Sequence, residues 1–293
     1  MGNRVQPEQK QINIPDDFSK KGYHTLSYVV WGDPSNHKTL VCVHGLTRNS
    51  RDFDYLAQSA LKDYCVMAID VAGRGKSEWL EDYSQYNYQR YTLDMLYLMD
   101  TLGLKNVHWL GTSMGGIIGM MVASLKPERI EKMVLNDIGA VVLGKAIERI
   151  MEYVRKDIEF QSLKELKQYM QSIFSGFGIA EDEHWNHMVK HSHIRTESEG
   201  YRLAYDPKIA QAIIETTSDV YDDMNLWELW HQVQQPVFII RGDESDILSK
   251  DVMQEMCKRD HVDSIEINNI GHAPALMEPS QISSVLDWFS KDV

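Results

Sequence analysis

Two short segments of the sequence contain residue types that together could activate a serine as a nucleophile. Residues 111–115 read Gly-Thr-Ser-Met-Gly, which places Ser113 in the pattern G-x-S-x-G, and His272 follows a glycine near the end of the chain. A serine hydroxyl becomes a good nucleophile when a neighbouring base takes its proton, and a carboxylate usually orients that base. The chemistry that these residues could perform is acyl transfer through a covalent intermediate on Ser113.

The surroundings of Ser113 predict a sharp turn between a strand and a helix. Residues 107–110 form an apolar, strand-like run before the motif, and residues 117–125 form an apolar helical run after it. Such a turn needs glycine two positions on either side of the serine, since side chains there would clash. The serine would stand at a helix N-terminus, where unpaired backbone N–H groups can stabilise an oxyanion. The structural alternative is a glycine-rich turn with a buried serine.

His272 is the candidate base among 11 histidines. It follows the last strand-like run, on a loop that begins with glycine, and its late position fits the chain order serine, acid, histidine. Five other histidines lie in or just after a helical region: His184, His187, His191, His193 and His231. The sequence places no set of carboxylates on the same helix face, as a metal site would need. We therefore interpret these histidines as residues of a solvated helix face and expect no metal.

The segments around these motifs alternate between strand-like and helix-like patterns. Strand-like runs lie at residues 25–31, 39–44, 65–70, 107–110, 130–136, 237–240 and 265–267. Helical patterns lie at residues 52–61, 91–102, 114–125, 227–233, 250–259 and 279–289. This alternation predicts an α/β fold with a mostly parallel sheet and helices on both faces. The turn residues 33–36 join the first two runs, which we expect to form an antiparallel start to the sheet.

The alternation stops between residues 139 and 223. Apolar residues recur there at helical spacing, and Ser162 with Glu165 reads as a capping box at the start of one helix. We therefore predict a helical insertion over residues 139–223, within a core formed by residues 1–138 and 224–293.

Three segments resemble those of the α/β-hydrolase superfamily. They are residues 43–46 (Val-His-Gly-Leu), 111–116 (Gly-Thr-Ser-Met-Gly-Gly) and 271–274 (Gly-His-Ala-Pro). The resemblance extends over nearly the whole chain, and its motifs identify the superfamily well and the substrate badly. It implies a mostly parallel, eight-stranded sheet with a helical cap inserted after the sixth strand.

The resemblance also implies the donors of an oxyanion hole. In the family the residue after His-Gly supplies one donor, here the backbone N–H of Leu46, and the mechanics of the serine motif assign the other to Met114. His44 itself is expected to be structural, because a base at that strand end would compete for the oxyanion pocket.

Two aspartates compete for the role of the acid that orients His272. The family commonly places the acid in the loop after the strand-like run at 237–240, three or four residues beyond a glycine, and Asp246 fits that position. Some members place it after the preceding strand, where Asp137 stands. We expect Asp246 to hold His272, and Asp137 to serve as a turn or cap residue.

The insertion is expected to shape the substrate site. In the family such an insertion covers the catalytic residues and excludes water. Phe174, Phe177 and Trp185 are the candidate pocket residues, with core packing inside the insertion as the alternative.

The composition restricts the classes of partner. Lys and Arg number 30 against 43 Asp and Glu, which gives a net charge of −13 and argues against nucleic acid or anionic membranes as partners. Cys42, Cys65 and Cys257 show no metal or C-x-x-C spacing, and the first six residues lack an apolar signal region. We expect a cytoplasmic protein that acts on a small molecule; the sequence does not indicate its oligomeric state.

These features together predict a serine hydrolase that cleaves a small carboxylic ester or related acyl compound, without a cofactor. A serine nucleophile argues against epoxide hydrolases and haloalkane dehalogenases, which share the fold but use aspartate. Hydrolysis of a carbon–carbon bond in a vinylogous diketone, lactonase, perhydrolase and aminopeptidase activity are the enzymatic alternatives. A ligand sensor on a hydrolase fold is the non-enzymatic one.

Overall fold

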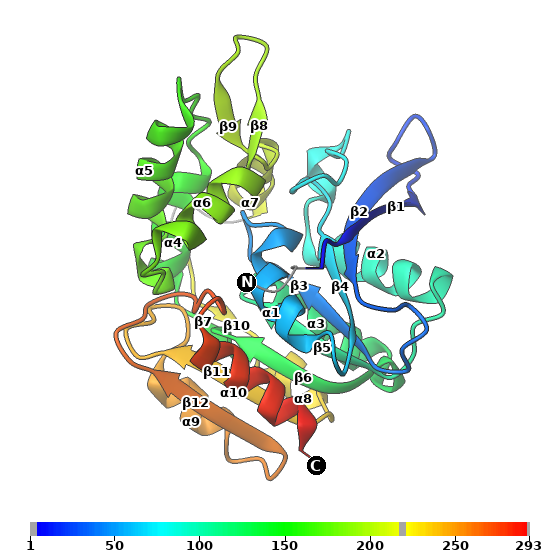
Figure 1. Ribbon diagram of the computed structural model, residues 1–293. Helices are drawn as coiled ribbons and strands as arrows, with labels where there is room; N and C mark the ends of the chain where they lie inside the picture. Colours follow the sequence, from blue (N-terminus) through cyan, green and yellow to red (C-terminus); the bar gives the residue numbers. More distant parts are fainter. Residues whose placement is uncertain (1–4, 217–220, 292–293) are drawn as a thin grey trace.

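Eight strands form one sheet that organises the rest of the chain (Figure 1). The computed structural model describes residues 5–216 and 221–291. The strands follow the order β1-β2-β4-β3-β5-β6-β11-β12. Their bounds are β1 (Glu8–Pro15), β2 (Tyr23–Trp31), β3 (Thr39–Val43), β4 (Cys65–Asp70), β5 (Val107–Thr112), β6 (Ile130–Asn136), β11 (Val237–Gly242) and β12 (Val262–Ile267). From β4 to β12 all neighbours are parallel, which confirms the mostly parallel α/β sheet.

The start of the sheet differs from the expected pairing. β2 and β3 contain the two runs that the sequence predicts to pair, but β4 lies between them. β2 instead pairs antiparallel with β1 and with β4. The sequence pattern does not predict β1, because its residues are mostly polar and only Ile14 is buried. An edge strand with a solvated face needs little apolar sequence.

Apolar side chains fill both faces of the sheet. In β3, Val41 and Val43 belong to one cluster while Leu40 and Cys42 belong to the other, as the two-residue period of a strand requires. The first cluster is covered by α2 (Tyr88–Thr101), α3 (Met114–Leu125), α8 (Trp227–Gln232) and α9 (Lys250–Met256). The second is covered by α1 (Asp54–Ala60) and α10 (Pro279–Ser290). Within the described residues, no helix is both long and apolar enough to cross a membrane.

The segment between β6 and α8 is largely helical and lies together on one side of the sheet (Figure 1). It contains α4 (Gly144–Val154), α5 (Leu163–Ile173), α6 (Asp182–His191), α7 (Lys208–Thr216) and a hairpin of β8 (His193–Arg195) with β9 (Tyr201–Leu203). At its two ends, β7 (Val141–Val142) pairs with β10 (Met224–Asn225), so both connections to the core run side by side. Residues 217–220 of the predicted insertion lie outside the described residues.

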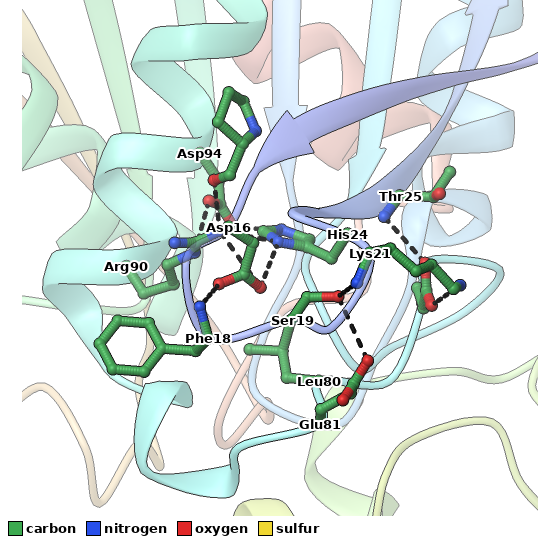
Figure 2. A network of polar contacts seen from close by, with 12 residues as sticks. Asp16, Phe18, Ser19, Lys21, His24, Thr25, Leu80, Glu81, Arg90 and Asp94 are labelled. Carbon is green, nitrogen blue, oxygen red and sulfur yellow. Dashed lines mark hydrogen bonds and ion pairs between the residues drawn. The ribbon is translucent and has the colours of Figure 1, made fainter.

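A buried ionic network fastens the first two strands to α2, as Figure 2 shows. Nδ1 of His24 lies 3.1 Å from Asp16 Oδ2, and its Nε2 lies 3.0 Å from Asp94 Oδ2. Arg90 donates from Nη2 to His24 Nδ1 over 2.7 Å and pairs through Nε with Asp94 Oδ1 at 2.9 Å. His24, Asp16 and Asp94 are each at most 3% exposed, so none of their polar groups can be compensated by bulk water.

We therefore expect Asp94→Ala to lower the free energy of unfolding by about 3–5 kcal/mol, because it leaves Nε2 of the buried His24 without its partner and the half-buried Arg90 without its closest carboxylate. Urea denaturation followed by circular dichroism measures the change. Glu81→Ala is the matched control, since Glu81 lies near the same network but makes exposed hydrogen bonds to Ser19 and to the Lys20 backbone. Equal denaturation midpoints for the two variants would contradict a structural role for the network.

Candidate active site

Ser113 stands on the predicted turn between a strand and a helix. It follows β5 directly and precedes α3, with φ 51° and ψ −115°. A residue other than glycine pays about 1–3 kcal/mol for such a backbone conformation, and the surrounding structure must enforce it. The Ser113 N–H donates to the carbonyl oxygen of Asn136 in the adjacent strand over 2.9 Å, which helps to fix the turn.

The two glycines of the motif are required by close backbone contacts. A Cβ atom on Gly111 would lie 2.3 Å from the Gly115 oxygen, and one on Gly115 would lie 2.0 Å from the Val43 oxygen. Both distances are far inside van der Waals contact. The expected steric reason for glycine two positions on either side of Ser113 is thus confirmed.

His272 lies between Ser113 and a carboxylate. Its Nε2 is 3.0 Å from Ser113 Oγ, and its Nδ1 is 2.6 Å from Oδ2 of Asp137. In the neutral tautomer whose Nδ1–H donates to Asp137, Nε2 carries a lone pair and can accept the serine proton. The expected proximity of Ser113 and His272 is therefore present, and the carboxylate beside them is that of Asp137.

The expectation that Asp246 holds His272 is wrong. Asp246 forms a side-on pair with Arg149 of α4, with 2.5 Å between Nε and Oδ2 and 2.9 Å between Nη2 and Oδ1. Burial alone would raise the pKa of Asp246, but the hydrogen bonds and charge of Arg149 outweigh it and hold that pKa below its ordinary value. The physical reason is the partner that each carboxylate has: Oδ2 of Asp137 lies 2.6 Å from His272 Nδ1, whereas both oxygens of Asp246 are engaged by Arg149.

Asp137 is fully buried and accepts from two further donors besides His272. Oδ1 accepts from the Gly242 N–H over 3.1 Å, and Oδ2 accepts from Ser245 Oγ over 2.6 Å. These bonds compensate the desolvation of the carboxylate and aim one of its oxygens at the imidazole. Asp137 also has a positive φ of 56°. The sequence carries one signal for this arrangement, the position of Asp137 immediately after an apolar strand.

His44 is a structural residue of the loop after β3. It is fully buried; its Nδ1 donates to the Gly45 oxygen over 2.7 Å, and its Nε2 accepts from the Val71 N–H over 3.0 Å. Burial lowers the pKa of His44 to about 3, so the ring stays neutral at ordinary pH. With both nitrogens engaged by the backbone, His44 cannot also serve as a base for Ser113.

Two backbone N–H groups beside Ser113 have no acceptor in the part of the chain that the structure describes. They belong to Leu46 and Met114, the two residues that the sequence predicts as oxyanion donors. The peptide group that carries the Leu46 N–H is held through the carbonyl oxygen of Gly45, which accepts from His44 Nδ1 over 2.7 Å and from the Arg48 N–H over 3.1 Å. Free N–H groups at a fixed position are what a developing oxyanion requires.

Two hollows adjoin Ser113. The larger, of about 470 Å³, is mostly apolar and extends past Met114 and Ile117 toward α4 and α7. The smaller, of about 50 Å³, is bordered by His272, Arg48 and Arg149.

The predicted pocket residues do not all reach these hollows. Phe174 and Phe177 line the smaller one. Trp185 lines neither and is buried inside the insertion, where its Nε1 donates to the Ile179 oxygen over 3.2 Å. Two further residues of the smaller hollow were not predicted: Arg48, which lies two residues after Leu46, and Arg149, which lies within the predicted helical insertion.

A cluster of possible metal ligands lies away from Ser113. Asp54, His187 and His191 have ligand atoms within 4.8 Å of one another. The guanidinium of Arg51 already pairs with Asp54 at 2.5 Å and contacts His191 Nδ1 at 3.2 Å. A metal ion would have to displace this cation, so the cluster is a poor metal site.

Known proteins resemble this chain over most of its length. A family model described as the alpha/beta hydrolase fold matches residues 38–279. The 3-hydroxybutyrate-oligomer hydrolase of Cupriavidus necator is 38% identical over 279 residues, which cover 93% of this chain and 95% of that protein. A crystal structure of a putative hydrolase from Rickettsia typhi has a TM-score of 0.91 at 35% identity, covering 98% of this chain and 100% of that one. An alpha/beta hydrolase from Novosphingobium aromaticivorans has a TM-score of 0.84 at 29% identity, covering 97% and 98%. This chain therefore belongs to the α/β-hydrolase family.

Proposed function

We propose that the protein hydrolyses carboxylic esters through an acyl-enzyme on Ser113. The observation that carries the proposal is the line of contacts from Ser113 Oγ to His272 Nε2, at 3.0 Å, and from His272 Nδ1 to Asp137, at 2.6 Å. Free N–H groups of Leu46 and Met114 lie beside the serine. A nucleophile, a base, an orienting carboxylate and oxyanion donors are the parts that acyl transfer needs.

The reaction would proceed in two halves. Ser113 Oγ attacks the ester carbonyl while His272 takes its proton, and the N–H groups of Leu46 and Met114 bind the oxyanion. His272 then gives the proton to the leaving alcohol oxygen as the ester C–O bond breaks. In the second half a water molecule, deprotonated by His272, attacks the acyl group and releases the acid. Asp137 stabilises the imidazolium in both halves without being protonated.

The substrate that we propose is a short ester of a hydroxy acid. The relative that is 38% identical over 93% of this chain is a hydrolase of 3-hydroxybutyrate oligomers. The large, mostly apolar hollow beside Ser113 suits an acyl part with methyl branches. Residues 139–223 would act as the cap of this site, since α4 and α5 contribute Arg149, Ile150 and Ile173 to the smaller hollow.

The first prediction concerns the nucleophile. The wild-type protein should hydrolyse the dimer and trimer of 3-hydroxybutyrate as well as nitrophenyl butyrate. Ser113→Ala should lower kcat by about 10⁶, the scale of loss when the serine of such a triad is removed. Ser124→Ala is a suitable control, because Ser124 lies near the C-terminal end of α3 and its hydroxyl donates to Gln232. A Ser113→Ala variant that kept a tenth of the wild-type rate would remove Ser113 from the mechanism.

A second prediction separates the two aspartates. Asp137→Asn should lower kcat by about 10⁴, because an amide at this position favours the wrong tautomer of His272. Asp246→Asn should lower kcat on the neutral ester nitrophenyl butyrate less than about tenfold, since Asp246 contacts Arg149 and not the imidazole. Steady-state kinetics on folded variants makes the comparison. The opposite order of losses would return the acid to the loop after β11.

A further inference from the structure

Two arginines border the smaller hollow in the same manner. Arg48 gives Nε and Nη2 to Asp52 at 2.9 and 2.6 Å, and Arg149 gives Nε and Nη2 to Asp246 at 2.5 and 2.9 Å. Each side-on pair uses the Nε–Nη2 edge of the guanidinium, so Nη1 takes no part in it. Neither Nη1 has an acceptor among the described residues.

Arg48 is the more unusual of the two. It is 3% exposed, and its Nη1 is buried without a partner. A buried charged donor without an acceptor costs free energy, so such groups are rare unless they have a function. The guanidinium lies 5.0 Å from the centre of the Phe174 ring, which restricts its plane. The fold thus holds a fixed, charged donor at the border of the hollow that contains Ser113.

The position of His272 indicates which part of an ester enters this hollow. His272 lines the smaller hollow, whereas the larger one is lined by Met114 and Ile117 and not by His272. During acylation the imidazole must hand its proton to the alkoxy oxygen of the leaving group. The leaving group therefore belongs on the side of His272, and the acyl part belongs in the larger hollow.

The size of the smaller hollow limits the leaving group. Its volume of about 50 Å³ leaves room for the carboxylate end of a small leaving group, and two guanidiniums stand at its border. A carboxylate is also the acceptor that guanidinium N–H groups bind most strongly.

We propose that Arg48 and Arg149 bind the free carboxylate of the leaving hydroxy acid. This inference rests on the proposed ester hydrolysis at Ser113. The terminal ester bond of an oligomer then lies at Ser113: its C–O bond breaks, a C–O bond to Oγ forms, and the proton on His272 goes to the released hydroxyl. The enzyme consequently removes one hydroxy acid at a time from the carboxyl end.

The test compares two forms of one substrate: the dimer of 3-hydroxybutyrate as the free acid, and the same dimer as its methyl ester at the carboxyl end. For the wild-type protein, kcat/KM for the internal ester bond should be about 10- to 100-fold higher with the free acid, the range expected for a charge-assisted hydrogen bond. With a trimer whose carboxyl-terminal unit carries an isotopic label, the label should appear first in the monomer and not in the dimer.

Arginine variants test whether Arg48 and Arg149 cause the preference for the free acid over the methyl ester. Arg48→Met should lower kcat/KM on the free acid 10- to 100-fold and change that on the methyl ester less than threefold. Arg149→Met should act in the same direction, and its side chain is 42% exposed, so its loss disturbs the fold less. Arg51→Met is the matched control, because Arg51 also pairs with an aspartate nearby but does not line the hollow. Its kinetics on both substrates should equal those of the wild type.

The outcomes separate this inference from the proposed function. Equal wild-type rates on free acid and methyl ester would overturn the carboxylate site while leaving ester hydrolysis intact. Equal loss on all substrates, nitrophenyl butyrate included, in both Arg48→Met and Arg149→Met would make the arginines structural and would also overturn it. Absence of hydrolysis of every ester by the wild type would instead refute the proposed function.

Discussion

The buried carboxylate of Asp137 is the group on which the arrangement around Ser113 depends. It joins three segments that are distant in sequence: the end of β6, the loop after β11 through Gly242 and Ser245, and the loop of His272. A fully buried carboxylate needs these donors, because each lost hydrogen bond leaves part of the cost of removing the charge from water uncompensated. The same bonds that stabilise the charge therefore fix the imidazole relative to Ser113.

The turn at Ser113 adds a second constraint, which acts through contacts between backbone atoms. The positive φ of Ser113 persists because Gly111 and Gly115 let the chain approach Val43 and itself more closely than any side chain permits. Both constraints act at the carboxyl ends of β3, β5 and β6, which are neighbours in the sheet. The sheet order thus brings the loop of Leu46, the turn of Ser113 and the carboxylate of Asp137 to the same end of the sheet.

Features encoded in short stretches of sequence were predictable, and features that depend on contacts between distant residues were not. Ser113 and His272 could be found because each stands in a local pattern beside a strand. Asp137 and Asp246 both follow strands and both precede His272, so sequence alone could not rank them by distance. Contacts between distant residues decide between them, because Arg149 engages Asp246 while Asp137 lies against His272. The polar edge strand β1 shows the same limit, because its pairing and not its composition makes it a strand.

The ion pair between Asp246 and Arg149 shows how the smaller hollow is assembled. It holds Arg149, which comes from α4 in the insertion, while Arg48 and Asp52 come from the core. The smaller hollow therefore acquires its second arginine only when the insertion is seated on the core. An anion that contacts both arginines binds best in that seated arrangement and must stabilise it by the same free energy.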